Sequence, residues 1–382
     1  MPQVKPDVQT FARIKVVGVG GSGKNATNHM ISNKTKGVDF IAINTDAQDL
    51  HHSLAKKKIH IGKNVTRGLG TGMNPEMGRK AVEETKEEVQ EAIKGADMVF
   101  ITCGLGGGTG SGASPIVARI SKEIGALTVG VVTKPFFFEG KQRLAVANQA
   151  LEDLRKEVDA IIVIPNDRLL ESVSKETTAK NAFASCDDIL KQAVEGISDL
   201  ITTPGIINID FADIKAVMAE AGSALMGMGV ASGENRAEEA AKIAINSPLL
   251  DISINGAKGV LFSIAGGDDL TMYEIQEAAK IITESTDPDA RVIFGTIRDE
   301  SLKKGEVKVT IIASGFPDGG LPTQKKSLFG GEKEVRETEE IEEETKKEAK
   351  KKLKEEEKDN TPEDDDDEWG AVPAFLRRSK IK

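Results

Sequence analysis

Several residue types and patterns are scarce in this chain of 382 residues, and each scarcity excludes a class of protein. Two cysteines are too few for a disulfide framework, which fits a reducing cytosol. The four histidines show no metal-ligand spacing, so no zinc site is expected. No apolar run reaches 18 residues, and no basic-then-apolar pattern follows Met1. We therefore expect a soluble, cytoplasmic protein with no direct membrane span.

A concentration of basic residues, as in a nucleic-acid-binding face, is also missing from the body of the chain. The net charge is −10, but residues 330–368 hold 19 acidic and 9 basic residues, and residues 369–382 hold four basic and no acidic ones. Residues 1–329 are therefore nearly neutral, and no nucleic-acid partner is expected. Residues 330–368 also have almost none of the aromatic and β-branched residues that a core requires. They predict a disordered acidic linker that ends in a basic peptide.

The N-terminal part of the chain alternates short apolar runs with helical patterns. The runs are rich in β-branched residues and almost continuously apolar, as in strands that are covered on both faces. This pattern predicts an α/β domain with a parallel sheet. The expected strands are Ile14–Val19, Phe40–Asn44, Lys58–Ile61, Met98–Cys103, Thr128–Val132 and Ala160–Ile164.

A long helical pattern from Thr178 to Thr202 separates this part from a second one. At 1.5 Å per residue this helix would extend about 35 Å, enough to cross a domain. The second part predicts a smaller α+β domain. Its expected elements are helices near Ala237–Ile245 and Tyr273–Ser285 and strands at Lys258–Ile264, Arg291–Thr296 and Glu306–Ile312.

The most informative feature present is the glycine-rich run GLGGGTGSGASP, from Gly104 to Pro115. It follows an expected strand and precedes a helical pattern at Ile116–Ile124. Glycines let backbone N–H groups approach an anion, and the positive end of the next helix favours negative charge. The run therefore predicts a phosphate cradle. It is not a Walker A loop, because no lysine follows the glycines.

A second glycine-rich loop, GVGGSGKN at Gly18–Asn25, is ambiguous when taken alone. It matches the dinucleotide pattern G-x-G-x-x-G, with Asp46 after the next strand. It also nearly matches a P-loop, but Asn25 stands where a Ser or Thr would hold Mg²⁺. A third loop, GLGTGMNP at Gly68–Pro75, precedes a helix that Asn74 and Pro75 are expected to cap and open. Three such loops at successive strand ends favour one triphosphate site over a dinucleotide site.

With these glycine-rich loops the chain resembles the tubulin/FtsZ superfamily, and within it the bacterial-type FtsZ family. The run GGGTGSG matches the signature of that superfamily. Further segments occur in the order that the family has them, from Phe11 to about Gly315. They are NTDAQ (Asn44–Gln48), TKPFFFEGKQR (Thr133–Arg143), IPNDRLL (Ile164–Leu170), NIDFADIKAVM (Asn208–Met218), GVASGENRAEEAA (Gly229–Ala241) and, near the end, VPAFLRR.

The resemblance implies a GTPase that binds GTP and GDP with Mg²⁺ and polymerises head to tail into the cell-division (Z) ring. It implies that Phe183 stacks on guanine, that Asn166 and Asp187 read its edge, and that Glu139 and Arg143 contact ribose and base. A carboxylate can accept from both guanine N1–H and the 2-amino group, which favours GTP over ATP. The remaining nucleotide-binding residues that it implies are Gly20, Gly21, Ser22, Gly23, Lys24, Asn25, Gly70, Gly72, Gly106, Gly107, Gly108, Thr109, Gly110 and Pro135. Ser22 stands where the family usually has glycine.

Asp210 and Asp213 are the candidates for positioning the attacking water, with Asn208 orienting their loop. They lie past the long helix, whereas Asp187 lies in its first part, so we expect them roughly 20–35 Å from the base. Water positioning requires contact at about 3 Å. The site must then be completed by a neighbouring subunit, in a heterologous contact that generates a filament. Asp213 could also cap the helix that follows it.

These patterns together predict a division of the chain and leave alternatives. The expected segments are a flexible N-terminus (1–10), a GTP-binding domain (11–177), a central helix (178–203), a C-terminal α+β domain (204–317), an acidic linker (318–368) and a docking peptide (369–382) for membrane-associated adaptors. A non-hydrolysing scaffold of the same superfamily is the nearest alternative function. A partitioning-type P-loop ATPase and an NAD(P)-dependent oxidoreductase are more distant ones.

Overall fold

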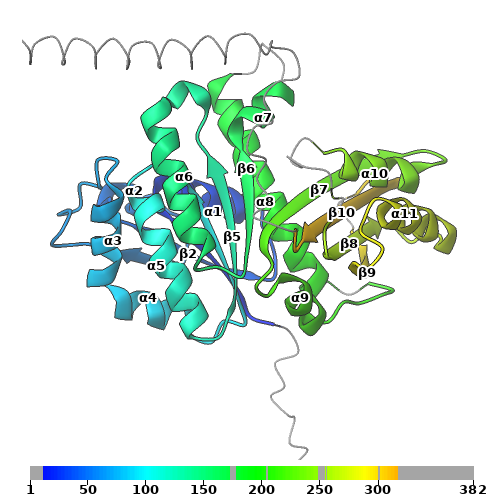
Figure 1. Ribbon diagram of the computed structural model, residues 1–382, viewed down its shortest axis with the longest axis horizontal. Coiled ribbons are helices and arrows are strands. Elements are labelled where there is room, and N and C mark those ends of the chain that lie inside the picture. Colours follow the sequence, from blue (N-terminus) through cyan, green and yellow to red (C-terminus); the bar gives the residue numbers. More distant parts are fainter. Residues whose placement is uncertain are drawn as a thin grey trace, which may run out of the picture. The chain divides into compact units, whose positions relative to one another are not determined.

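The computed structural model describes residues 12–172, 178–203, 205–247, 254, 256–299 and 302–316 (Figure 1). The predicted N-terminal segment 1–10, the acidic linker 318–368 and the docking peptide 369–382 lie outside the described residues. Within the described residues, ten strands form one sheet in the order β3-β2-β1-β4-β5-β6-β7-β10-β8-β9. The pairs from β3 to β7 are parallel, and β10 runs antiparallel to both of its neighbours.

The first half of the sheet is a doubly covered parallel sheet, as the near-continuous apolar runs predict. Its strands are β1 (Ile14–Val19), β2 (Val38–Asn44), β3 (Lys57–His60), β4 (Met98–Gly104), β5 (Leu127–Lys134) and β6 (Ala160–Pro165). Its helices are α1 (Gly20–Ser32), α2 (Ala47–His51), α3 (Pro75–Glu84), α4 (Lys86–Ile93), α5 (Thr109–Glu123), α6 (Lys141–Arg155) and α7 (Asn166–Ser172), with a 3₁₀ turn η1 (Phe137–Glu139).

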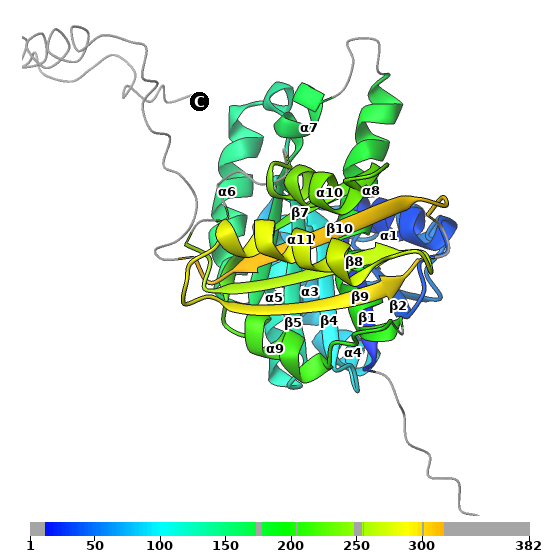
Figure 2. The same cartoon turned by 90° about the vertical axis from the view of Figure 1, so that its right-hand side faces the viewer.

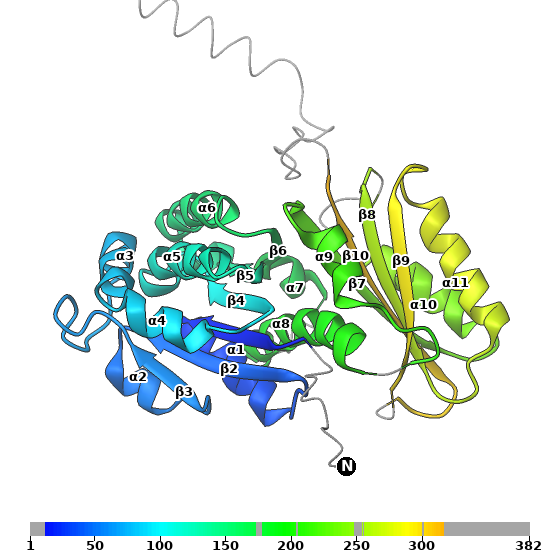
Figure 3. The same cartoon turned by 90° about the horizontal axis from the view of Figure 1, so that it is seen from below.

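Two separate apolar cores lie on the two faces of this part of the sheet. Helices α3 to α6 pack on one face and bury Ile101 and Leu151, among others. Helix α1 packs on the other face together with the long helix α8 (Ala179–Thr202) and buries Met30 and Phe100. Figure 3 shows these helices on opposite sides of the strands. The core beneath α8 extends into the second half of the molecule, since it also contains Leu261 and Ile312.

The second half consists of α9 (Phe211–Met218), β7 (Gly222–Ser232), α10 (Arg236–Ile245), β8 (Gly259–Gly266), α11 (Met272–Glu284), β9 (Arg291–Arg298) and β10 (Glu306–Ser314). Helices α10 and α11 cover one face of its strands around a core that includes Phe262 and Ile282 (Figure 2). The other face packs against α8 and α9. The predicted fold class is therefore confirmed: a parallel-sheet domain, a long helix and a smaller α+β domain.

One strand and one helix start differ from the sequence prediction. Strand β7 is missing from the prediction, because its glycines and methionines are weak strand formers. Its glycines serve close packing instead, since a methyl group on Gly229 would lie 2.1 Å from the carbonyl oxygen of Ala240 in α10. Helix α5 begins at Thr109, inside the glycine run, and α1 begins at Gly20, inside the other loop. The predicted start of the former helix at Ile116 is therefore wrong.

Candidate functional site

The three glycine-rich loops converge at the carboxyl ends of β1 and β4, which are neighbours in the sheet. A methyl group on Gly20 would lie 3.0 Å from the backbone nitrogen of Gly110, and one on Gly104 would lie 2.7 Å from Ser22 Oγ. One on Gly108 would lie 2.2 Å from Thr71 Oγ1. The loops therefore pack against one another at positions where a larger residue would push them apart. Open α/β sheets bind ligands in this place.

Two helix N-termini open into this crevice. The first turns of α1 and α5 contain no acidic side chain, and no side chain caps either N-terminus. Their free backbone N–H groups and positive dipole ends favour an anion. Of the remaining predicted phosphate ligands, Gly21 and Gly23 lie in the first turn of α1, and Gly106 and Gly107 lie in the loop before α5.

Buried hydroxyl groups join the three loops. Thr109 Oγ1 lies 2.6 Å from Thr45 Oγ1 and 3.2 Å from Thr71 Oγ1, and all three side chains are buried. Thr71 belongs to a loop with unusual backbone angles, since its neighbours Gly70 and Gly72 have φ of 80° and 56°. Glycine adopts such values without strain. The hydroxyl cluster thus ties the Gly68–Pro75 loop to the glycine run, and Asn74 and Pro75 cap and open α3 as predicted.

Lys24 is placed differently from a P-loop lysine. Its ammonium group lies 2.6 Å from Asp49 Oδ1, and the lysine is buried. Asp49 Oδ2 in turn accepts a hydrogen bond from Asn44 Nδ2 at 2.8 Å. The positive charge of Lys24 is therefore balanced by a carboxylate within the fold. The crevice between the three glycine-rich loops therefore offers the backbone N–H groups of α1 and α5 to an anion, whereas the ammonium group of Lys24 is already paired.

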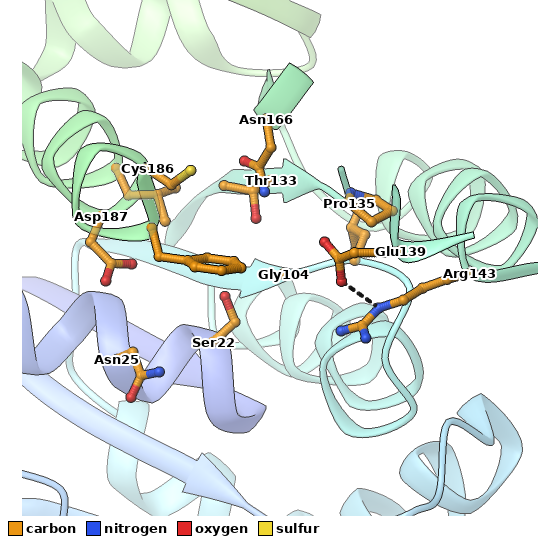
Figure 4. A pocket seen from close by; sticks show the side chains of 13 residues that line it. Ser22, Asn25, Gly104, Thr133, Pro135, Glu139, Arg143, Asn166, Cys186 and Asp187 are labelled. Carbon is orange, nitrogen blue, oxygen red and sulfur yellow. Dashed lines mark ion pairs between the residues drawn. The ribbon is translucent and has the colours of Figure 1, made fainter. Parts of the chain in front are cut away.

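A cavity continues from the glycine loops between α1, α6 and α8 (Figure 4). It is lined by residues from five segments that are far apart in the sequence. Eight of the predicted residues line it: Ser22, Asn25, Pro135, Glu139, Arg143, Asn166, Phe183 and Asp187. Gly104, Leu105, Thr133, Cys186 and Leu190 line it as well and were not predicted. The other predicted nucleotide-binding residues are not among the lining residues: Gly20, Gly21, Gly23, Lys24, Gly70, Gly72, Gly106, Gly107, Gly108, Thr109 and Gly110.

Aromatic and amide groups occupy one end of the cavity. The side chain of Phe183 is 50% exposed although it lies on the long helix, so it is not a core residue. Its ring meets that of Phe136 edge to face, with centroids 5.3 Å apart. Asn166 is buried at the start of α7, and among the described residues its Oδ1 has no hydrogen-bond partner. An unpaired buried amide oxygen is costly, and a ligand that donates to it would remove that cost.

Two neighbouring residues of α8 have raised pKa values at the same end. Burial raises the pKa of Asp187 to about 6, against a lowering by His29 and with a further rise from Asp188. His29 Nε2 lies 2.7 Å from Asp188 Oδ1. Burial also raises the pKa of the Cys186 thiol to about 12, so this thiol is neutral at pH 7. At neutral pH the cavity therefore presents one carboxylate and no thiolate from this helix.

A carboxylate and a guanidinium group lie at the opposite end. Glu139 Oε2 is 3.1 Å from Arg143 Nε, one turn further along the chain. Glu139 Oε1 also accepts a hydrogen bond from the backbone N–H of Phe136 at 3.0 Å. This holds the end of η1 and directs the guanidinium toward the cavity, as Figure 4 shows.

The predicted catalytic residues do not reach this cavity. Asn208, Asp210 and Asp213 are exposed and lie beyond the end of α8, around the start of α9. From Asp187 the helix continues to Thr202, which is about 22 Å at 1.5 Å per residue. Asp210, not Asp213, caps α9, since its side chain accepts a hydrogen bond from the N–H of Ala212. The suggestion that Asp213 is the capping residue is therefore wrong, and its carboxylate has no structural task of that kind.

Comparisons with known proteins agree on one family. The GTPase domain of the tubulin/FtsZ family matches residues 13–174, and the C-terminal domain of the FtsZ family matches residues 222–317. An empty FtsZ dimer from M. jannaschii is 49% identical with a TM-score of 0.77, over 81% of this chain and 89% of that one. This chain belongs to the FtsZ family.

Other solved structures extend the similarity. A tryptophan-to-tyrosine mutant of M. jannaschii FtsZ is 48% identical over 81% of this chain and 92% of its own, with a TM-score of 0.77. CetZ2 from Haloferax volcanii, a GTPγS-bound protofilament, is 21% identical over 80% and 94%, with a TM-score of 0.68. The similarity to CetZ2, at 21% identity, shows the fold alone.

As an FtsZ, the chain is a GTPase of the tubulin superfamily, a self-associating cytoskeletal protein of cell division. This agrees with the predicted family and enzyme class, and an oxidoreductase or a P-loop ATPase is excluded. In the part of the chain that the structure describes, no helix has the length and apolar character to cross a membrane.

Two polar residues of this FtsZ were missed by sequence reasoning although a signal was present. Thr45 lies inside the quoted NTDAQ segment, and Thr71 lies between Gly70 and Gly72. Their hydroxyl groups could have been considered as partners of Thr109. Leu105 also had a signal, since it lies inside the predicted phosphate cradle Gly104–Pro115. Leu190 had none, because a buried leucine looks the same at a cavity and in a core.

Proposed function

We propose that this FtsZ assembles head to tail and that Asp210 and Asp213 of one subunit complete the GTPase site of the next. The observation that supports this most directly is the separation of the two carboxylates from the cavity by most of the length of α8. Both are exposed at the other end of that helix, where a neighbouring subunit could bring its nucleotide to them. Where its rotation does not close into a ring, such a heterologous contact yields an open filament.

In this proposal GTP occupies the cavity and the crevice between the loops. Phe183 stacks on guanine, Asp187 accepts from N1–H and the 2-amino group, and Asn166 reads the same edge. Glu139 and Arg143 contact the ribose and base, next to Pro135. The phosphates are held by the segments Gly20–Asn25, Gly70–Gly72 and Gly106–Gly110, mostly through backbone N–H groups. The raised pKa of Asp187 and the unpaired oxygen of Asn166 support ligand contacts at that end.

Mg²⁺ is proposed to bind together with the GTP phosphates. Among the described residues there is no cluster of three or more His, Cys, Asp or Glu side chains that could hold a metal ion. Mg²⁺ in phosphate sites keeps several waters and takes few protein ligands, all of them oxygen atoms. The hydroxyls of Thr45, Thr71 and Thr109 are oxygen atoms of this kind next to the glycine run. When bound, the ion would neutralise phosphate charge.

The proposed division of labour along the chain follows the sequence prediction. Residues 11–177 would bind GTP, the helix at 178–203 would connect, and residues 204–317 would carry the catalytic loop. The segment 318–368 would tether the basic peptide 369–382 to membrane-associated adaptor proteins, and so bring the filament to the mid-cell ring in the cytoplasm. Both of these last segments lie outside the described residues.

Turnover per subunit as a function of protein concentration tests the shared site. We expect turnover to vanish below a critical concentration and to rise as filaments form, with light scattering that depends on GTP but not on ATP or NAD⁺. Normal turnover by dilute monomers would contradict the shared site. Assembly with GTP but without phosphate release would instead support the non-hydrolysing scaffold.

A further inference from the structure

The loop that carries the proposed catalytic residues is attached to the outermost strand of the sheet. Strand β9 is the last in the sheet order, and its free edge is met by the chain between α8 and α9. The N–H of Ile207 donates to Thr296 Oγ1 at 2.9 Å, and the N–H of Thr296 donates to the carbonyl oxygen of Ile207 at 3.0 Å. One threonine therefore satisfies both backbone groups of Ile207.

The fit at this contact is tight. A methyl group on Gly205 would lie 1.5 Å from the carbonyl oxygen of Thr296, so that only glycine can stand there. One on Gly295 would lie 2.8 Å from the side chain of Ile209, which is buried. Thr296 itself is 3% exposed. Close-packed contacts of this kind leave the loop little freedom to shift.

The contact leads directly to the carboxylates. Asn208 Oδ1 accepts a hydrogen bond from the N–H of Gly205 at 2.7 Å, which closes the loop on itself. Asp210 follows two residues later and caps α9, whose first turn contains Asp213. A displacement of Ile207 would therefore be passed on to both carboxylates, because Asp210 is only three positions further along the chain.

We infer that Thr296 is a positioning residue for hydrolysis, whose hydroxyl group fixes Ile207 and thereby the reach of Asp210 and Asp213 toward the neighbouring subunit's GTP. This inference rests on the proposed function. It assigns part of the GTPase site to the edge strand β9. In the proposed arrangement this strand contacts no nucleotide of its own subunit.

Substitution of Thr296 by valine isolates the hydroxyl group. Valine keeps the volume, the strand preference and the backbone donor of position 296, so the bond to the Ile207 carbonyl can persist. The N–H of Ile207 loses its acceptor, and an unpaired donor is free to turn away. Serine at position 296 keeps the hydroxyl. Thr310, a buried threonine of β10 that lies two strands away, gives the control substitution Thr310→Val.

The experiment compares Thr296→Val, Thr296→Ser, Thr310→Val and Asp213→Ala in the full chain, measuring GTP affinity of monomers, critical concentration, KM and kcat. For Thr296→Val we expect kcat to fall about tenfold, since small misplacements in an active site have effects of this order. GTP affinity, critical concentration and KM should stay within about twofold of wild type, as should every parameter of Thr296→Ser and Thr310→Val.

Other outcomes would overturn either the positioning role of Thr296 or the proposed function. Unchanged kcat in Thr296→Val, or an equal loss in Thr296→Ser, overturns the inference. So does a loss of GTP affinity or assembly as large as the loss in kcat, because that indicates a role in folding only. If Asp213→Ala turns over GTP normally, the proposed function fails. If Asp213→Ala is slow and Thr296→Val is normal, only the positioning role fails.

Hydrogen exchange provides a readout that does not depend on activity. The amide hydrogen of Ile207 should exchange about tenfold faster in Thr296→Val than in wild type, because its acceptor is gone. Exchange in α10 and α11 should not change. Equal exchange at Ile207 in the two proteins would show that the hydroxyl does not hold the loop, whether or not kcat is affected.

Discussion

The two ends of the long helix α8 differ in how their polar groups are held. At the cavity end, polar groups are buried and joined to each other: Thr109 to Thr45 and Thr71, and Lys24 to Asp49. At the other end, Asp210 and Asp213 are exposed, and the fixed part of the structure is the backbone beneath them, clamped to β9. The chain is held in place at both ends, but only the cavity end encloses its polar groups.

This difference shows how binding and chemistry can be divided within one chain. An enclosed site can bind a ligand without help, because its desolvated groups are already in place. Exposed carboxylates on a fixed backbone gain their full electrostatic effect only when a partner excludes water from them. Nucleotide binding should therefore belong to the monomer, and hydrolysis to the assembled pair. Five predictions test this contrast.

The largest effect is expected for Asp213→Ala. Removal of a group that positions the attacking water should lower kcat at least about 100-fold, while the GTP affinity of the monomer stays the same. Phosphate release from sedimented filaments measures it. Asp289→Ala, an exposed aspartate in the loop before β9, is the matched control and should be neutral. A parallel loss of GTP affinity would mean that the two ends of α8 are not separate.

The next effect concerns the cavity end. Asp187→Ala should weaken GTP binding roughly 10- to 100-fold, because hydrogen bonds to a charged group contribute about 1.5–3 kcal/mol. The variant should also discriminate less between GTP and ITP, which lacks the 2-amino group. Asp188→Ala, its exposed neighbour on the same helix, should bind both nucleotides as wild type does. Fluorescence titration of monomers gives all of these affinities.

A smaller effect is expected from pH. Because burial raises the pKa of Asp187 to about 6, the carboxylate that accepts from guanine is lost as the pH falls below that value. GTP affinity should be nearly constant above pH 7 and fall about tenfold between pH 7 and pH 5. Asp187→Asn should remove this dependence.

The effect of Asp187 on folding stability has the opposite pH dependence to its effect on GTP affinity. A raised pKa means that the folded state binds the proton more tightly than the unfolded state, so this group's stabilisation is lost as pH rises through about 6. Asp187→Asn should therefore unfold at a higher denaturant concentration than wild type at pH 7.5. A lower midpoint would indicate that the carboxylate is stabilised by a partner rather than desolvated.

The smallest effect separates the two functions of Asp210. Asn caps helices as well as Asp does, whereas Ala cannot. Asp210→Ala should lower the free energy of unfolding by about 1 kcal/mol, and Asp210→Asn should leave it unchanged. Both should hydrolyse GTP slowly, since both lack the charge. Equal stability of the two variants in urea would show that the cap does not contribute.

Most of the fold could be predicted because apolar continuity and β-branched residues mark buried parallel strands. The exceptions have a common cause. Glycines in β7 and in the first turn of α5 indicate breaks in regular structure when only the sequence is considered, but they permit close contact with a neighbouring element. Gly229 against α10 is an example. A single sequence cannot distinguish a glycine that turns the chain from one that makes room for another segment.

The candidate site divides in a similar way. Residues such as Asn166, Phe183 and Asp187 could be assigned by the family resemblance, and they do line one cavity. The contact of Thr296 with Ile207 could not, since a threonine in a strand carries no sign of its partner across the sheet edge. The ion pair of Lys24 with Asp49 likewise joins residues of two different segments. Such long-range contacts require the folded chain.

The distance between the cavity and the two aspartates has one more consequence, which concerns filament ends. In a filament of n subunits joined as proposed, there are n cavities but only n − 1 complete sites. A terminal subunit whose cavity faces outward keeps its GTP until the next subunit brings its carboxylates. The two tips would therefore differ chemically, since one has an incomplete nucleotide site and the other exposes an unused catalytic loop, and growth and loss of subunits would have a built-in direction.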